Sequence, residues 1–321
     1  MKVQLSGGDD RNLMERLLEK QIPLSNSCNG KGTCGKCKVR VVSGTITDVT
    51  DTERRLLTEK EVAGHMRLAC MTKARGEVVI ETGEGEEDHV FTTGGVEGHF
   101  ERDADKHGYG LAVDIGTTTV VATLVNMDDG TEGPTYAQIN PQKTYGLDVL
   151  TRITYETEHK EAAISQLQKA IVQGLNEAAT AVCNEAGIEV TEITEIDVAA
   201  NCTMLHMLAG VDARPIGRAP YKPAFTDGQK LKARDLGLVG ATDATVYLLP
   251  SVSAYIGADI VAGVYVCDLR HASGKTLFID IGTNGELVLE AGSKMYSCSC
   301  AAGPALEGMN ITSGMRAAKG A

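Results

Sequence analysis

Apolar positions in the first part of the chain recur with two spacings, and each spacing predicts a different element. Helical spacing runs through residues 12–21, while apolar and polar residues alternate over 38–44 and 76–83. A short alternating stretch over 1–7 precedes the helical segment. These patterns predict a small α+β module over residues 1–83, with room for only one strand before its first helix.

The pattern changes near residue 110, where longer apolar strands begin to alternate with helices. Apolar strands flank a Gly-Thr turn over 110–125 and again over 277–290. Helices are predicted between the two copies, and also just before Cys70, where Thr58 and Glu61 have the spacing of a capping box. The predicted helices between the copies are 145–153, 161–187, 203–210 and 257–269, and the predicted strands are 195–201 and 246–251.

Hairpins followed by alternating helices and strands predict an α/β fold of the ribonuclease-H-like, actin type. We expect a first ribonuclease-H-like subdomain over 108–270 and the start of a second over 271–321. Residues 84–107 are acidic and Gly-rich and have no clear period, so we expect a linker there.

Composition narrows the classes of function. The chain has 321 residues and a net charge of −12, which argues against general nucleic-acid or acidic-membrane binding. No apolar run approaches the ~20 residues that span a bilayer. Nine cysteines, an odd number, and the lack of a secretory segment indicate a reducing cytoplasm. Five cysteines in apolar surroundings are expected to be core residues: Cys183, Cys202, Cys267, Cys298 and Cys300.

The other four cysteines form a pattern of their own. Cys28, Cys34 and Cys37 lie on one glycine-rich loop, and Cys70 follows much later. This C-x5-C-x2-C spacing with a distant fourth cysteine favours a two-iron, two-sulfide (2Fe–2S) cluster, because plant-type ferredoxins use a first gap one residue shorter. Structural zinc and four unrelated buried cysteines remain as alternatives. The loop glycines, which would allow positive φ around a cluster, are Gly30, Gly32 and Gly35.

The two Gly-Thr turns form an internal repeat, with their aspartates 166 residues apart. The matched pairs are Asp114 with Asp280, Gly116 with Gly282, and Thr117 with Thr283. Turn N–H groups and threonine hydroxyls can donate to phosphate, and the aspartate can hold Mg²⁺ through water. No G-K-[ST] follows, so this is not a P-loop. A nucleotide-phosphate clamp is predicted, with repeated structural hairpins as the alternative.

The chain resembles the family of reductive activators of corrinoid-dependent enzymes, which join a 2Fe–2S ferredoxin domain to a domain of the acetate kinase, sugar kinase, Hsp70 and actin (ASKHA) superfamily. The resemblance covers nearly every region except the linker. It is carried by CNGKGTCGKC, GLAVDIGTTTVVATLV, NPQKTYGLDVLTRI, ANCTMLHMLAG, LPSVSAYIGADIVAG, FIDIGTNGELVLE and CAAGPALEGMNITSGMRA.

The resemblance implies a β-grasp ferredoxin domain and ATP-driven reduction of a corrinoid cobalt from Co(II) to Co(I). The implied partners are a corrinoid protein or corrinoid-dependent methyltransferase and an upstream electron donor. We expect Asp114 and Asp280 to hold Mg²⁺, and Thr117, Thr118, Thr283 and Asn284 to hold phosphate. Glu286 is a candidate for orienting water, with a salt-bridge or solvated role as the alternative.

Two departures from the family pattern stand out. No further domain lies between the ferredoxin and kinase-like regions, and the sequence stops about 40 residues after Asp280. The second ribonuclease-H-like half is therefore expected to be incomplete, with the nucleotide site half built. On this expectation the chain acts as an enzyme only if the missing half is supplied.

Two rival functions follow from the same residues. The chain could be a plain 2Fe–2S electron carrier with a non-functional ATPase remnant. It could also be a metabolite kinase or a hydantoin-type hydrolase, but such enzymes have no use for the four N-terminal cysteines.

Overall fold

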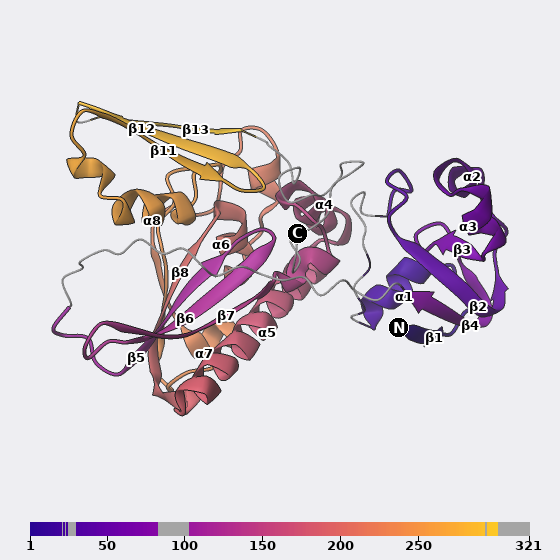
Figure 1. The fold of residues 1–321 in the computed structure, drawn as a ribbon, viewed down its shortest axis with the longest axis horizontal. Helices are drawn as coiled ribbons and strands as arrows, with labels where there is room; N and C mark the ends of the chain where they lie inside the picture. The colour runs from indigo at the N-terminus through magenta and orange to yellow at the C-terminus, as the bar shows by residue number, and fades with distance from the viewer. Residues whose placement is uncertain (21, 23, 25–29, 83–102, 293, 301–321) are drawn as a thin grey trace. The chain divides into compact units, whose positions relative to one another are not determined.

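The computed structural model describes residues 1–20, 22, 24, 30–82, 103–292 and 294–300. These residues fall into two compact units, each with a sheet and a core of its own (Figure 1). The first unit holds the described residues up to Thr82 together with 143–147, and the second holds the other described residues. Among all of them, no helix is both long enough and apolar enough to cross a lipid bilayer.

A four-stranded antiparallel sheet organises the first unit, in the order β1-β4-β2-β3. Its strands are β1 (Lys2–Leu5), β2 (Lys38–Ile46), β3 (Met66–Leu68) and β4 (Ala74–Thr82). Helix α1 (Leu13–Glu19) begins at Asn12, whose side chain accepts from the N–H of Glu15, and it buries Leu13 and Leu17 completely in the core of the unit. One strand precedes the first helix, as predicted.

Two short helices follow β2, and both begin with the same capping motif. In α2 (Asp51–Leu56) the hydroxyl of Thr50 accepts from the N–H of Glu53, whose carboxylate accepts in return from the N–H of Thr50. Helix α3 (Glu59–Ala63) repeats this arrangement with Thr58 and Glu61. The sequence predicted α3 but not α2, although both carry the T-x-x-E signal.

A six-stranded sheet organises the second unit, in the order β7-β6-β5-β8-β10-β9. Its strands are β5 (Tyr109–Ile115), β6 (Thr119–Asn126), β7 (Thr131–Ile139), β8 (Ile193–Ala200), β9 (Gln229–Lys232) and β10 (Thr245–Leu248). Strands β5, β6 and β7 pair antiparallel, whereas β8 lies parallel to β5 and β10 parallel to β8. Antiparallel strands followed by parallel crossover strands confirm the predicted fold class. Strands β7 and β9 were not predicted.

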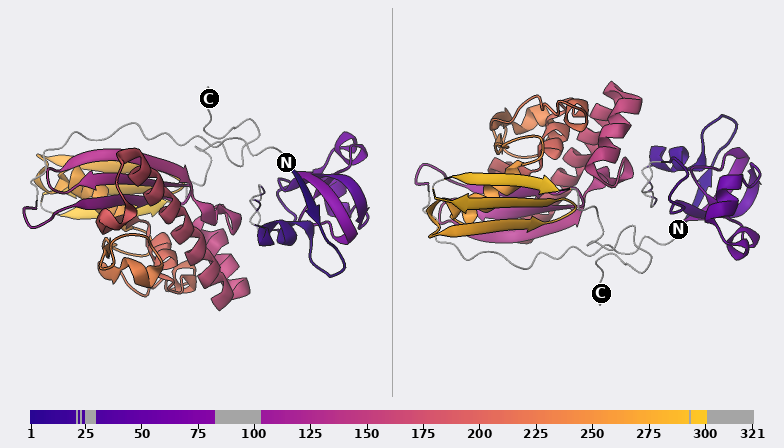
Figure 2. Two further views of the ribbon diagram at one scale, coloured as in Figure 1. Left: turned by 90° about the horizontal axis from the view of Figure 1, so that it is seen from below. Right: turned by 90° about the horizontal axis from the view of Figure 1, so that it is seen from above.

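Helices cover one face of this sheet. The longest, α5 (Glu161–Ala186), runs along β6 and β7 (Figure 2). Its buried residues, including Leu167 and Ile171, recur at helical spacing, and it ends at Gly187 in the left-handed conformation. The other helices of the unit are α4 (Val149–His159), α6 (Cys202–Ala209), α7 (Ala233–Leu236) and α8 (Ala258–Val266). Short 3₁₀ turns are η1 (Pro141–Thr144), η2 (Val190–Glu192), η3 (Arg214–Gly217) and η4 (Leu269–His271).

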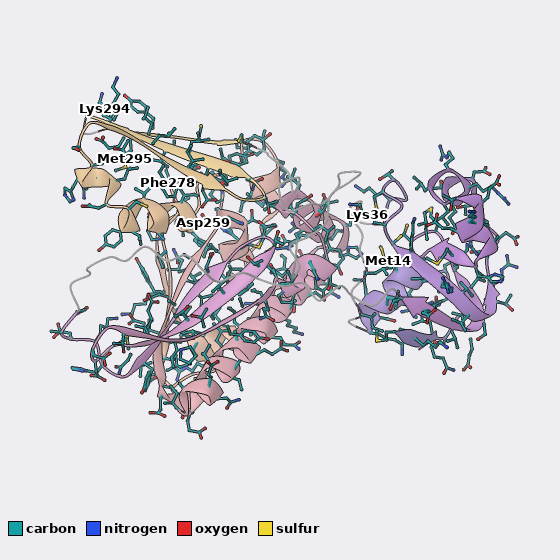
Figure 3. All side chains as sticks on the ribbon, viewed as in Figure 1. Met14, Lys36, Asp259, Phe278, Lys294 and Met295 are labelled. Carbon is teal, nitrogen blue, oxygen red and sulfur yellow. The ribbon has the colours of Figure 1, made fainter. Side chains whose placement is uncertain are left out.

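A second, three-stranded sheet of this unit packs on α8. Its antiparallel strands are β11 (Lys275–Ile281), β12 (Gly285–Ala291) and β13 (Met295–Cys300). Val288 is buried against Ile260 of α8, and a Cβ added at Gly263 would lie 2.6 Å from the ring of Phe278 (Figure 3). The opposite face of the sheet is exposed and apolar, with Ile279 half uncovered.

Two sequence predictions need correction. The helix predicted over 145–153 is α4, which begins four residues later because the side chain of Asp148 caps it. Three of the five expected core cysteines are exposed: Cys267, Cys298 and Cys300. The last two lie on the exposed face of β13, opposite the face that packs on α8. The other two, Cys183 and Cys202, are buried as predicted.

Candidate functional site

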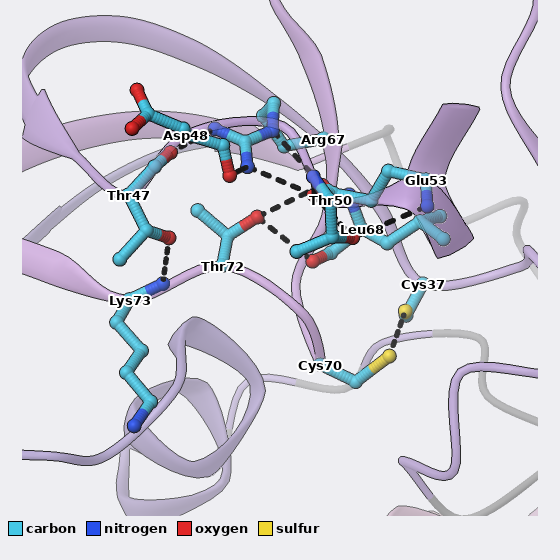
Figure 4. Close-up of polar contacts among 10 residues, drawn as sticks. All are labelled: Cys37, Thr47, Asp48, Thr50, Glu53, Arg67, Leu68, Cys70, Thr72 and Lys73. Carbon is cyan, nitrogen blue, oxygen red and sulfur yellow. Dashed lines mark hydrogen bonds and ion pairs between the residues drawn. The ribbon is translucent and has the colours of Figure 1, made fainter.

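Two of the three described cysteines of the first unit, Cys37 and Cys70, come together at one end of its sheet. The sulfur atoms of Cys37 and Cys70 lie 3.3 Å apart, and both residues are buried (Figure 4). Cys37 directly precedes β2, and Cys70 follows β3, which pairs with β2. Cys34 is half-buried on the same loop as Cys37, and Cys28 lies outside the described residues. The structure thus brings together two residues 33 positions apart in the sequence.

The loop that precedes Cys37 depends on glycine. Gly30, Gly32 and Gly35 all have positive φ, near 70–80°, as the sequence predicted. A Cβ added at Gly30 would lie 3.9 Å from the Cβ of Cys70 and 2.6 Å from the terminal methyl of Met14 in α1. The backbone at Gly30 therefore lies close to Cys70.

The chemistry of this donor set fits an iron–sulfur cluster. Paired buried thiols beside a loop with repeated positive φ are what a sulfide-rich core needs from a protein. In the part of the chain that the structure describes, no three Cys, His, Asp or Glu side chains converge closely enough to hold an ion. A site with four thiolate ligands would therefore combine Cys34, Cys37 and Cys70 with Cys28, which lies outside the described residues.

A second candidate site lies in the other unit, where the two Gly-Thr turns meet. The first turn joins β5 to β6, and the second joins β11 to β12. The hydroxyls of Thr118 and Thr283 lie 3.2 Å apart, so the turns are in direct contact. Two segments 165 residues apart in the sequence therefore form one site.

A cavity of about 260 Å³ opens between these turns. All nine residues that the sequence predicted for this site line it: Asp114, Gly116, Thr117, Thr118, Asp280, Gly282, Thr283, Asn284 and Glu286. Asp280 and Glu286 are direct cross-strand partners of β11 and β12. The repeat therefore identified residues that the fold brings into one cavity.

Three further lining residues were missed by the sequence reasoning: Thr119, Asn201 and Asp259. Asn201 caps α6 and donates to the hydroxyl of Thr117 over 3.1 Å. Asp259 lies in the first turn of α8 (Figure 3). It is preceded by Gly257, where an added Cβ would come within 2.5 Å of the Cα of Asn201. Gly257 lets α8 begin close to α6, and this glycine was the signal in the sequence that could have indicated Asp259 as a site residue.

Burial disfavours the ionised form of the carboxylates that line this cavity. Burial, together with the charges of Asp259 and Asp280, raises the pKa of Asp114 to about 6. Burial likewise raises the pKa of Asp259 and of Glu286 to about 6, and it raises the pKa of Asp280. The hydroxyl of Ser299 donates to Glu286 and partly opposes this shift.

This charge distribution restricts the ligands that the cavity can accept. Among the described lining residues there is no Lys or Arg. An anionic phosphate alone would face four acidic groups, whereas a divalent cation would neutralise them and bridge to phosphate oxygens. The cavity is therefore suited to a cation–phosphate complex, with threonine hydroxyls and turn N–H groups as donors.

A buried polar network supports the first turn from behind. The side chain of Asn140 donates to the carbonyl of Gly116 over 2.8 Å, and its backbone N–H donates to the carbonyl of Thr118 over 2.8 Å. Between them, the guanidinium of Arg152 donates to the carbonyl of Thr117 over 2.5 Å. Gln142 links Asn140 and Arg152, and all three of these side chains are fully buried. Three successive carbonyls of the turn are thus fixed by one network.

Three protein-family descriptions match the chain. "2Fe-2S iron-sulfur cluster binding domain" matches residues 1–75, "RACo middle region" matches 109–272, and "C-terminal domain of RACo the ASKHA domain" matches 274–321. The middle match alone covers just over half of the chain. The three matches leave out the segment that the sequence predicted to be a linker.

Similar proteins support the same grouping. The "Corrinoid activation enzyme RamQ" of Eubacterium limosum is 36% identical over 217 residues, which are 68% of this chain and 36% of that protein. The "Co(II) methylated amine-specific corrinoid protein reductase" of Methanosarcina barkeri is 24% identical over 222 residues, 66% of this chain and 40% of that protein. A solved structure titled "Reductive activator for corrinoid,iron-sulfur protein" superposes with a TM-score of 0.63 at 29% identity, covering 98% of this chain and 64% of that one. The chain thus spans less than two thirds of each of them.

Proposed function

The chain belongs to the RACo family, and from this premise we propose that it activates a corrinoid protein or corrinoid-dependent methyltransferase by ATP-dependent one-electron reduction. One electron passes to the partner's cobalt, which goes from Co(II) to Co(I), and an upstream donor replaces that electron. The observation that carries the proposal is the presence, in one chain, of a paired-thiol site matched to a 2Fe–2S domain and a carboxylate-lined cavity between two Gly-Thr turns.

In the first unit we assign Cys28, Cys34, Cys37 and Cys70 as the ligands of a 2Fe–2S cluster. The bound cluster would supply a carrier that takes up and releases one electron at a time. The residues of the chain position it: β2 and β3 fix Cys37 and Cys70 side by side, and the positive-φ glycines let the loop backbone approach closely.

In the second unit we assign the cavity to ATP with Mg²⁺. Asp114 and Asp280 would hold Mg²⁺ through water, with Asp259 nearby, and the pKa values that burial raises in all three support a cation that neutralises them. The hydroxyls of Thr117, Thr118 and Thr283 and the amide of Asn284 would hold phosphate oxygens, with Gly116 and Gly282 leaving the backbone accessible. Glu286, held by Ser299, would orient water.

Nucleotide binding would act as a conformational gate. The two turns meet at the hydroxyls of Thr118 and Thr283, so a ligand that bonds both turns favours their closed arrangement. In our proposal the closed state favours the complex in which cobalt is easier to reduce. For a one-electron step each shift of about 59 mV changes the equilibrium tenfold, so a modest difference in nucleotide affinity between states suffices.

The test is Asp114→Ala in the full chain, loaded anaerobically with iron and sulfide and supplied with a chemical reductant. With a Co(II) corrinoid protein as acceptor, we expect the nucleotide-stimulated part of cobalt reduction to disappear, followed by the corrinoid absorbance. The visible spectrum of the cluster should be unchanged, because Asp114 lies in the other unit. Glu132→Ala, which removes an exposed carboxylate from β7, is the matched control. Undiminished stimulation in Asp114→Ala would exclude the proposed gate.

A plain electron carrier is the second candidate, and the first unit favours it specifically. That unit has a sheet, a core and a match to a cluster-binding domain of its own. In that case electron transfer to any acceptor would proceed at the same rate with and without ATP and Mg²⁺, in the unmodified chain as well as in Asp114→Ala.

A further inference from the structure

The segment that carries Cys70 is held from behind by a single buried carboxylate. Strand β3 ends at Leu68, and a tight turn brings the chain through Cys70 to Thr72 (Figure 4). Glu53 of α2 reaches this turn through hydrogen bonds from Leu68 and Thr72. Glu53 and Thr72 are fully buried, and Arg67 is 4% exposed.

The two oxygens of the Glu53 carboxylate have different partners. Oε1 accepts from the N–H of Leu68 over 3.1 Å, from the hydroxyl of Thr72 over 3.1 Å and from Nε of Arg67 over 2.9 Å. Oε2 accepts from the N–H and hydroxyl of Thr50, over 2.9 and 3.0 Å, and from Nη2 of Arg67 over 2.9 Å. One oxygen therefore holds the segment around Cys70, and the other holds the start of α2.

The remaining contacts close this turn and connect Arg67 to residues 47 and 48. The single hydroxyl proton of Thr72 is shared between Glu53 and the carbonyl of Leu68, whose oxygen lies 3.0 Å from the hydroxyl. Arg67 donates to the carbonyls of Thr47 and Asp48 over 2.7 and 3.0 Å. Burial alone would raise the pKa of Glu53, but hydrogen bonds from Arg67, Thr50 and Leu68 lower it to about 2, so the carboxylate is ionised at neutral pH.

Stability alone does not account for this arrangement. A buried ion pair is often replaceable by apolar side chains without loss of stability, because desolvation offsets the attraction. This pair instead fixes the position of the segment around Cys70. Glu53 accepts hydrogen bonds from Leu68 and Thr72, which lie two positions before and two positions after Cys70. Groups behind a metal ligand typically set the ligand's orientation and the affinity of the site.

We propose that Glu53, Arg67 and Thr72 are positioning residues that hold the Cys70 thiol beside that of Cys37, ready to receive iron. The inference rests on the proposed cluster, and it adds which side chains outside the ligand set govern retention of that cluster. The carboxylate acts through the backbone of Leu68 and the hydroxyl of Thr72 and needs no contact with the cluster itself.

A matched pair of substitutions tests the proposal. Thr72→Val and Thr50→Val each remove one hydroxyl that donates to Glu53, on the Cys70 side and the α2 side respectively. In the full chain loaded with iron and sulfide, Thr72→Val should lose its visible absorbance to a chelator about tenfold faster or more. It should also change the electron paramagnetic resonance spectrum of the reduced protein. Thr50→Val should lower the thermal midpoint through the lost helix cap but change the rate of cluster loss less than about twofold.

Equal rates of cluster loss in the two variants would overturn the proposal. Thr72→Ser keeps the hydroxyl and should restore the unmodified rate and spectrum. If Thr72→Val does not fold, Thr72→Ala against Thr72→Ser gives the same contrast.

Cys70→Ser separates this inference from the proposed function. If its iron content, spectrum and rate of cluster loss match those of the unmodified chain, Cys70 is not a ligand and the proposed cluster site is wrong. If Cys70→Ser disrupts the cluster while Thr72→Val behaves like Thr50→Val, only the positioning role is excluded.

Discussion

Gly116 and Gly282 occupy matching places in the two copies of the turn, yet their surroundings differ. A Cβ added at Gly116 would lie 2.9 Å from the carbonyl oxygen of Thr119, closer than real side chains come. At Gly282 the nearest atoms to an added Cβ are 3.6 Å away, which is ordinary van der Waals contact. The first copy therefore needs glycine for steric reasons, and the second does not.

This difference predicts unequal costs for the same substitution. Gly116→Ala should lower the free energy of unfolding by about 1–3 kcal/mol, because the backbone of the turn must shift to admit the methyl group. Gly282→Ala should change it by less than about 0.5 kcal/mol. Denaturant unfolding of the two variants, followed by circular dichroism, measures both. Equal losses at the two positions would mean that the contact with the Thr119 carbonyl imposes no constraint.

At this scale the repeat was more informative than the rest of the sequence. Two copies of one motif identified six of the nine predicted lining residues, because a repeated turn constrains the same chemistry twice, and the family resemblance added Thr118, Asn284 and Glu286. Asp259 and Arg152 escaped detection for a physical reason. Each reaches the site from a helix distant in sequence from the turn it serves, and neither has a local spacing that indicates this.

Helix α4 supports the first Gly-Thr turn through Arg152 and also carries a buried acid, Glu156. Arg152 and Glu156 lie one turn apart on its buried face, and both are fully buried. Burial lowers the pKa of Arg152 to about 9, with Asp148 opposing. Glu156 accepts from the N–H of Ala213 over 3.0 Å through one oxygen, and its other oxygen has no hydrogen-bond partner in the described structure.

The environment of Glu156 predicts a pH dependence of stability. Burial, with the nearby charge of Asp212, raises its pKa from 4.5 to about 7. A carboxyl whose folded-state pKa is raised stabilises the fold fully below the unfolded value, and this contribution is lost as pH rises through about 7. Glu156→Gln should therefore raise the free energy of unfolding by about 1–3 kcal/mol at pH 8. Near pH 4.5 it should make little difference.

The control lies on the same helix. Glu158 is exposed, so Glu158→Gln should leave the stability difference between pH 4.5 and pH 8 unchanged. Urea unfolding of both variants and the unmodified chain at the two pH values provides the comparison. A gain for Glu156→Gln that is the same at both pH values would show that this carboxyl does not titrate between them.

The boundaries of helices and strands could be predicted from the local apolar pattern in some cases and not in others. The start of α5 and its end at Gly187 were readable because the apolar stripe is long and the terminal glycine adopts a left-handed conformation. For α4 the apolar pattern ran through the residues before Asp148, and only the cap fixes the true start. Strand β7 was missed because it is largely polar and none of its residues is fully buried, which leaves alternation without a clear apolar face.

On the scale of the whole molecule, the chain combines two units with separate cores and separate chemistry. From sequence, the change of period near residue 110 predicts a boundary between two domains. The long-range pairing within each unit could not be predicted, since the contact between Thr118 and Thr283 and that between Cys37 and Cys70 depend on tertiary packing. The sequence could name these residues but could not bring them together.

Separate cores predict that each unit responds to its own ligand. A ligand that binds only the folded state stabilises the unit that holds it, by an amount set by its concentration relative to the dissociation constant. Stripping iron from the loaded chain should therefore lower one calorimetric transition by at least about 10 °C, given the small size of the first unit. Mg²⁺ with ATP should raise the other transition and leave the first in place.

Core substitutions assign the transitions. Leu5→Ala, in a side chain that is 1% exposed in the first unit, should lower the transition that depends on iron. Leu167→Ala, in a fully buried residue of α5, should lower the one that responds to Mg²⁺ and ATP. A single transition that both substitutions and both ligands move together would mean that the two units unfold as one. An iron-dependent transition lowered by Leu167→Ala but not by Leu5→Ala would place the metal in the wrong unit and remove the basis for a cysteine-bound cluster.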